Sequence, residues 1–111
     1  MKLTDGTIIK MKADENGVGE IIISSDIVVK NIVLTIKSRL SDERFIFNYD
    51  NIGKNLFSGE FHLKNVLAWS VQTPNLYDFS VEIQCADKLK KANGSFGCRS
   101  ISQNGKNVCL N

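Results

Sequence analysis

The chain has 111 residues and a formal net charge of +2 at pH 7. This length holds one hydrophobic core, so we expect a single domain over residues 1–111. Hydrophobic residues make up 42% and charged residues 23%, which excludes an intrinsically disordered chain. The weak and evenly spread charge indicates neither a nucleic-acid surface nor a membrane surface. No run is long and apolar enough to span a bilayer, and no secretory signal opens the chain.

The first predicted elements in chain order are strands. Residues 7–11 and 19–24 are rich in β-formers, and Asn16-Gly17 between them is a hairpin signal. Residues 32–37 and 45–49 then alternate, with Ile32, Leu34 and Ile36 on one face of the first and Phe45, Phe47 and Tyr49 on one face of the second. Such alternation is typical of a strand with one buried face.

Two further strands follow, and the second has the clearest pattern in the chain. In residues 57–64, Phe57, Phe61 and Leu63 point away from Glu60, His62 and Lys64, and in residues 77–85 every odd position is apolar or aromatic. Residues 87–91 have room for one helical turn, Asn93-Gly94 indicates a turn, and Asn104-Gly105 predicts a C-terminal hairpin.

These elements predict an all-β fold. Seven or eight short antiparallel strands in this length are typical of an immunoglobulin-like β-sandwich, and a small barrel is the structural alternative.

The three cysteines do not form a metal-binding pattern. Cys85, Cys98 and Cys109 contain no CxxC pair, and the single histidine, His62, is distant in sequence. A two-residue loop at 104–105 makes Cys98 and Cys109 diagonal neighbours, about 7–8 Å apart, at or beyond the limit for a disulfide. We therefore interpret the cysteines as small buried apolar residues.

The sequence offers little for catalysis. His62 lies among charged neighbours on the polar side of its strand, which favours a solvated side chain. Glu60 and Glu82 also fall on polar faces, without the apolar surroundings that raise a carboxyl pKa. Neither a GxSxG nucleophile elbow nor a phosphate-binding glycine loop is present. We expect no catalytic residue, no cofactor site and no metal site.

Two stretches carry a more specific pattern. Residues 67–77 read Leu-Ala-Trp-Ser-Val-Gln-Thr-Pro-Asn-Leu-Tyr, and residues 96–101 read Phe-Gly-Cys-Arg-Ser-Ile, with Leu-Asn at 110–111. In this order they resemble the immunoglobulin-like domain of glycoside hydrolase family 2, which includes β-galactosidases, β-glucuronidases and β-mannosidases. Ala68, Val71 and Cys98 depart from the usual residues of that pattern. The positions that carry the resemblance are Trp69, Pro74, Leu76, Tyr77, Phe96, Gly97 and Arg99.

Several of these positions have a physical role in their own right. Pro74 fixes its φ angle and extends Thr73, so the chain turns after Trp69. From that bend Trp69 can cap the open end of the core. Gly97 permits a close backbone approach or a bulge, and Arg99 either holds an adjoining domain or is an ordinary exposed strand arginine.

The resemblance implies a non-catalytic domain. In the family, two glutamates of a following TIM barrel perform a retaining hydrolysis, and no position here matches either of them. The chain then corresponds to an excised middle domain that holds a preceding jelly-roll domain and the barrel in fixed relation. The implied parent hydrolyses β-glycosides without a cofactor, is bacterial and cytoplasmic or periplasmic, and can form homo-oligomers. The alternative is a free-standing module that binds carbohydrate or protein, with Trp69 and Tyr77 as contacts.

Overall fold

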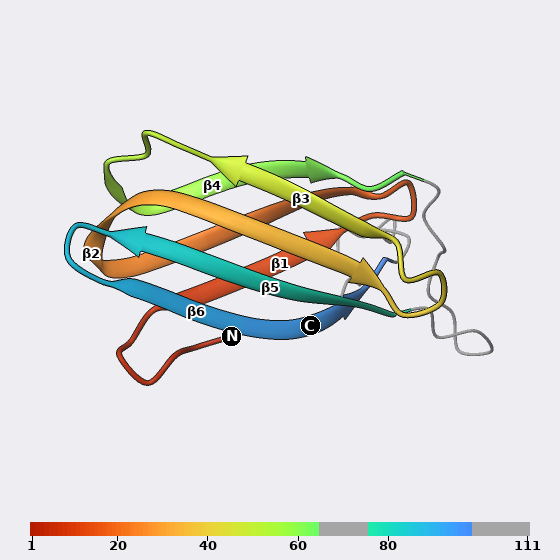
Figure 1. Cartoon of the computed structure of the whole chain (residues 1–111), viewed down its shortest axis with the longest axis horizontal. Coiled ribbons are helices and arrows are strands. Elements are labelled where there is room, and N and C mark those ends of the chain that lie inside the picture. The colour runs from red at the N-terminus through yellow and green to blue at the C-terminus, as the bar shows by residue number, and fades with distance from the viewer. Residues whose placement is uncertain (65–75, 99–111) are drawn as a thin grey trace, which may run out of the picture.

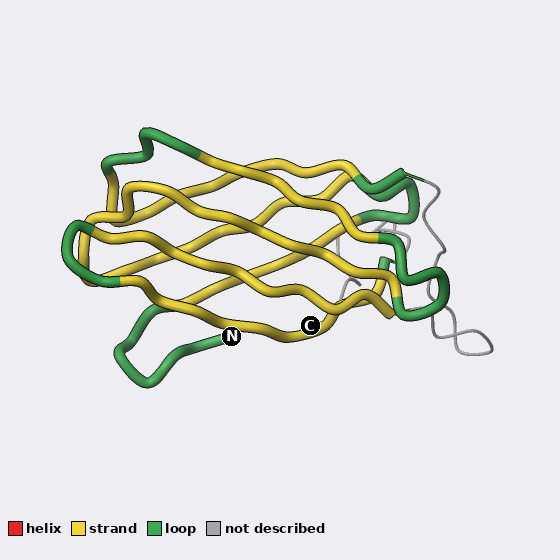
Figure 2. Tube along the Cα trace, viewed as in Figure 1, coloured by secondary structure: helices red, strands yellow, loops and turns green. Residues whose placement is uncertain are grey.

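The computed structural model describes residues 1–64 and 76–98. Within them the chain forms six antiparallel strands and no helix (Figures 1 and 2). The strands, in chain order, are β1 (Ile8–Ala13), β2 (Val18–Ser38), β3 (Arg44–Tyr49), β4 (Lys54–His62), β5 (Leu76–Cys85) and β6 (Leu89–Gly97). The predicted all-β fold is confirmed.

The long strand β2 belongs to both layers of the fold. Its first arm, residues 18–24, pairs with β1 and β4, and its second arm, residues 31–38, pairs with β3 and β5. β6 adds to the outer edge of β5. Figure 1 shows β2 bending at its middle and returning across the molecule, so the sheet folds back on itself as a sandwich. The sequence predicted the two arms as separate strands; counted that way, the described part holds seven.

A β-bulge at Lys30 lets β2 serve both layers. Before it the buried residues of β2 are at odd positions, ending with Val29, and after it they are at even positions, beginning with Ile32. The register moves by one residue here, because Val29 lies opposite Cys85 whereas Asn31 lies opposite Gln84. One extra residue reverses which side chains face the core.

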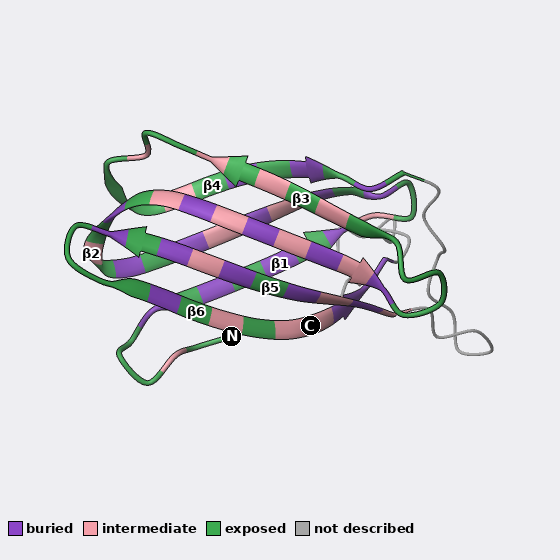
Figure 3. Cartoon of the chain, in the orientation of Figure 1, coloured by how far each residue is buried: buried purple, intermediate pink, exposed green. Residues whose placement is uncertain are grey.

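The alternation of the strands produces the core (Figure 3). In β5 every odd position from Tyr77 to Cys85 is buried, as predicted. The neighbouring arm of β2 supplies Ile32, Leu34 and Ile36, all 0% exposed. β1 and the first arm of β2 complete the other layer with Ile9, Met11, Ala13, Ile21 and Ile23. Both inner faces are therefore apolar, as burial of a sandwich core requires.

Aromatic rings gather around Phe96 at one end of this core. Phe96 stacks on Tyr77 with ring centroids 5.7 Å apart and an interplanar angle of 20°. Phe61 meets it edge-on at 6.2 Å, and Phe79 lies at 6.3 Å. Offset and edge-on pairs of this kind stabilise beyond the area they bury.

The first hairpin follows the sequence prediction. Gly17 has a φ of 83°, a left-handed conformation that favours glycine, and its N–H donates to the Asp14 carbonyl. Gly19, two residues later, is needed for space, since a Cβ there would lie 2.3 Å from Phe61 Cζ and 2.7 Å from the Lys12 carbonyl oxygen. The Asn-Gly signal therefore marks the turn correctly.

One local prediction near the C-terminal end is wrong, and one local possibility is not realised. Residues 87–91 have room for a helical turn but do not form it, because residues 89–91 already belong to β6. Asn93-Gly94 is not a turn either but lies inside β6, opposite Ser80 and Phe79. Pairing with the strongly alternating β5 overrides the local preference of this polar segment.

Candidate functional site

The described family-pattern residues are largely core residues. Tyr77 and Phe96 are 2% and 1% exposed, and Gly97 is buried opposite the half-buried Leu76 at the ends of β5 and β6. The Arg39 N–H donates to the Leu76 carbonyl oxygen at 3.2 Å. Trp69, Pro74 and Arg99 lie outside the described residues, and the roles expected of them stay predictions.

The interpretation of Tyr77 as a ligand contact is wrong. Its ring is buried against Phe96, where no sugar or partner surface can reach it. The free-standing binding module therefore loses one of its two expected contacts, and the other, Trp69, lies outside the described residues.

The candidate titratable residues are surface residues, as predicted. His62 and Glu60 are exposed on β4. Glu82 faces outward on β5, where its carboxylate lies 3.6 Å from Lys91 Nζ. β4 and β5 pair with different arms of β2, so the structure does not bring Glu60 and Glu82 to one face. Their positions provide no paired carboxylates for acid–base chemistry.

Two of the three cysteines are buried. Cys85 and Cys98 are both 0% exposed, as expected for small apolar residues. Cys109, and with it the predicted hairpin, lies outside the described residues.

The most unusual ionisable group was not found from the sequence. The Lys90 side chain is only 4% exposed, and its Nζ contacts four oxygen atoms that we call the Lys90 cluster. Those of Thr7, Ser25 and Asp26 lie at 2.8, 3.1 and 2.9 Å. The fourth, Asp5 Oδ2, lies at 3.1 Å.

The Lys90 cluster holds its charged groups in their charged forms. Burial lowers the pKa of Lys90, but hydrogen bonds to Asp26 and Asp5 outweigh burial and raise it above the usual value. Hydrogen bonds from Thr7 and from Lys90 lower the pKa of Asp5, and the hydrogen bond from Lys90 lowers that of Asp26. An ammonium has three protons, and four acceptors surround this one. Lys90 therefore has no lone pair to act as a nucleophile or base at neutral pH.

A signal for Lys90 does exist in the chain, although it is not local. Phe96, Gly94 and Ala92 face the interior of β6 at even positions, and the same phase continued backward places Lys90 inside and Leu89 outside. Hydropathy alone suggests the reverse, yet Leu89 is 48% exposed and Lys90 is buried. The phase set along β6 places Lys90 inside, and its ion pairs make that position tolerable.

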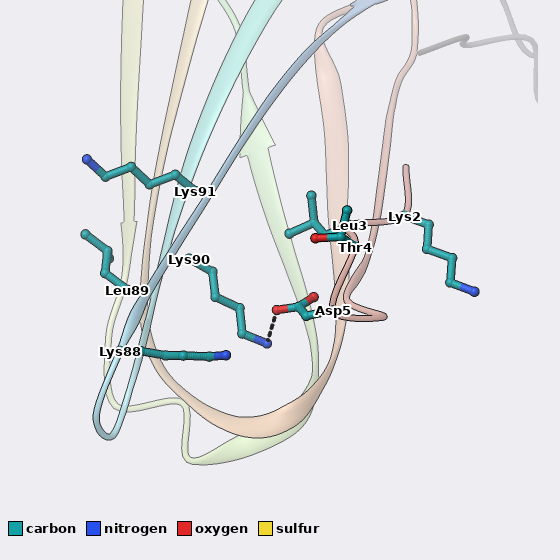
Figure 4. Close-up of a pocket in the computed structure, with 8 residues that line it drawn as sticks. All are labelled: Lys2, Leu3, Thr4, Asp5, Lys88, Leu89, Lys90 and Lys91. Atoms are coloured by element: carbon teal, nitrogen blue, oxygen red, sulfur yellow. Dashed lines mark ion pairs between the residues drawn. The ribbon is translucent and has the colours of Figure 1, made fainter.

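A groove of about 440 Å³ adjoins the Lys90 cluster, between residues 2–5 and residues 88–91. Figure 4 shows Lys90 reaching across toward Asp5, whereas the ends of Lys2 and Lys91 point away from that ion pair. The groove is thus bounded by a satisfied ion pair and solvated lysines.

A second polar contact joins the β2–β3 turn to β5. Arg39 Nε and Nη2 donate to the Asp78 carboxylate at 2.8–3.0 Å. These bonds lower the pKa of Asp78 and raise that of Arg39. Both side chains are about half exposed, at 49% and 47%, so the pair adds little stability.

Neither a metal centre nor a membrane span is found in the part of the chain described. Across residues 1–64 and 76–98, no three His, Cys, Asp or Glu side chains gather as a metal site would require. The same residues contain no helix with the length and apolar character needed to cross a membrane.

Comparison with known protein families shows which family this chain belongs to. The model of "Glycosyl hydrolases family 2" matches residues 4–99 of the 111-residue sequence. The chain belongs to this family. No relative is found among curated proteins.

The fold is also that of a segment of a β-glucuronidase of known structure. A crystal structure of Parabacteroides merdae β-glucuronidase with glycerol in its active site aligns with a TM-score of 0.57 at 18% identity. A second structure of that enzyme gives 0.54 at 15% identity. The alignments cover 92% and 83% of this chain but only 15% and 13% of the enzyme. This chain therefore spans only a small part of that much longer protein.

Proposed function

We propose that this chain is a non-catalytic middle domain of a family 2 glycoside hydrolase. It would hold a jelly-roll domain and a catalytic barrel in fixed relation within a parent that hydrolyses β-glycosidic bonds. One observation carries the proposal: the family match takes in residues 4–99, yet the aligned segment is only 15% of a β-glucuronidase chain.

The chemistry of the described residues supports a structural role. The one deeply buried cation, among the residues that the structure describes, is saturated by four oxygens of its own domain. The family-pattern residues Tyr77 and Phe96 pack against each other in the core and are not available to a ligand. A rigid sandwich whose polar groups are internally satisfied suits a spacer between domains.

The test is an activity assay of the purified chain. We expect no turnover of 4-nitrophenyl β-glucuronide, β-galactoside or β-mannoside, because Glu60 and Glu82 cannot act as a pair. The Glu60→Gln and Glu82→Gln variants serve as matched controls for contaminating enzyme. Turnover that co-purifies with the chain and disappears in either variant would overturn the proposal.

A further inference from the structure

We infer that Lys90 is a latch that holds the N-terminal segment, residues 1–7, across the open side of the sandwich between β1 and β6. The latch thereby fixes the direction in which the chain enters the domain.

The latch joins three separate parts of the chain. Lys90 comes from β6, Ser25 and Asp26 from the bend between the two arms of β2, and Asp5 and Thr7 from the N-terminal segment. The contacting residues are up to 83 positions apart in sequence. Asp5 also accepts hydrogen bonds from Thr7, within its own segment, so its ion pair with Lys90 ties the segment to β6.

The backbone of the N-terminal segment pairs with the outer edge of β1. Ile9 N–H donates to the Met1 carbonyl oxygen at 2.7 Å, and the Met1 amino group donates back to the Ile9 carbonyl oxygen at 2.7 Å. Within the segment, Leu3 N–H donates to Thr7 and Gly6 N–H donates to Leu3. The segment therefore covers backbone groups of β1 that an edge strand leaves open to association.

On its other side the segment approaches β6. A Cβ added to Gly94 would come within 2.8 Å of Met1 Cε, so this glycine makes room for the first residue. The segment thus lies between the edge of one layer, β1, and the edge of the other, β6. The segment therefore contacts β6 at two points: Asp5 pairs with Lys90, and Met1 packs beside Gly94.

The energetics suit a latch rather than ordinary core packing. Burying a lysine ammonium is costly unless it is paired and hydrogen-bonded, and here the pairing depends on the segment being in place. The Asp26 and Asp5 side chains remain 57% and 31% exposed, so both carboxylates can be hydrated when the segment lifts. Segment attachment and lysine burial are therefore coupled.

The functional part of the inference rests on the proposed function. If a preceding domain adjoins this one, the chain reaches the sandwich through residues 1–7, and Lys90 sets how rigidly that junction is held. The latch itself is independent of any glycosidase activity, so an unexpected result in the activity assay leaves it untouched.

Amide hydrogen exchange of the full chain, followed by NMR, tests the latch. In Lys90→Met we expect protection at Leu3, Gly6 and Ile9 to fall by about tenfold or more while β5 amides keep theirs, because only the segment is released. Lys91→Met is the matched control, since the Lys91 side chain is 67% exposed, and it should leave all of these amides unchanged.

A second variant keeps the test decisive if Lys90→Met fails to fold. Asp5→Asn removes only the carboxylate of the segment and leaves Lys90 paired with Asp26, so we expect the same local pattern with a smaller loss. Unchanged protection at Leu3, Gly6 and Ile9, or an equal loss throughout β5, would overturn the latch.

Discussion

Position 90 shows how ion pairs can hold a lysine in a buried position of a strand. A lysine occupies a place that faces the core, and the neighbouring leucine faces solvent. Hydrophobic burial alone favours the opposite arrangement. The four oxygens around Nζ compensate the desolvation of the ammonium, which is the condition for a charge inside a protein.

The same cluster makes a prediction about acid stability. In the folded chain the pKa values of Asp5 and Asp26 lie below their usual range, whereas in the unfolded chain each titrates near about 3.9. Their contribution to the free energy of unfolding is therefore fully present above about pH 4–5 and is lost as the pH falls through the lower folded values.

Thermal unfolding of Asp26→Asn against the unchanged chain measures this effect. We expect the variant to have the lower Tm by a constant margin from pH 7 to about pH 5, and the margin to shrink as the pH falls below about 4. Asp87→Asn, at an exposed position in the β5–β6 turn, should show no such margin. A margin that grows toward low pH would contradict the assigned pairing.

Among the elements, β2 depends on its bulge. The backbone around Lys30 is fixed by the β3–β4 loop, because Ile52 N–H donates to the Lys30 carbonyl oxygen and Gly53 N–H donates to that of Val29, both at 2.9 Å. The extra residue therefore has a defined place rather than being a defect of the strand.

Deleting Lys30 should prevent cooperative folding. The deletion shifts the second arm by one residue, so Ile32, Leu34 and Ile36 would turn from the core to solvent. Circular dichroism and urea unfolding should show the loss of a two-state transition. Lys30→Ala, at an exposed position, should stay within about 0.5 kcal/mol of the unchanged chain. Cooperative unfolding of the deletion variant would show that the arm can adopt another register.

The Tyr49 hydroxyl adds a hydrogen bond to the aromatic contacts between β3 and β4. Tyr49 OH donates to the Glu60 carbonyl oxygen at 2.6 Å and so satisfies a backbone group on β4. Burial, and then the negative charge of Glu60, raise the pKa of Tyr49 to about 12. A raised phenol pKa means that this group's stabilisation is lost as the pH rises from about 10 toward that value.

Tyr49→Phe should cost about 1 kcal/mol at pH 7, the usual net contribution of one hydrogen bond. Because the variant lacks the ionisable hydroxyl, the difference from the unchanged chain should narrow above about pH 10. Urea unfolding across pH 7 to 11 provides the measurement. A difference that is constant over this range would mean that Tyr49 keeps no raised pKa in the folded chain.

For the whole molecule, the fold was predictable because it follows from alternation. The phase of β5 placed Tyr77 through Cys85 inside, and the Asn16-Gly17 turn marked the first hairpin. β6 was not predictable from its own residues, because its lysines and Asn93-Gly94 have a turn-like composition. Its strand conformation comes from pairing with β5. The Lys90 cluster depends on residues brought from three distant segments, which no local pattern contains. The continuity of β2 was missed because a bulge resets the alternation.

The dominance of β2 has a consequence for synthesis on the ribosome. Every strand pairing in the described residues except β5–β6 includes β2. Its last residue, Ser38, emerges long before β4 and β5, whose final residues are His62 and Cys85. Until then the 21-residue strand β2 can pair only with β1 and β3, and its apolar side chains lack the opposite layer, the kind of surface that chaperones shield. The emergence of β5 is thus the moment when this domain can first close.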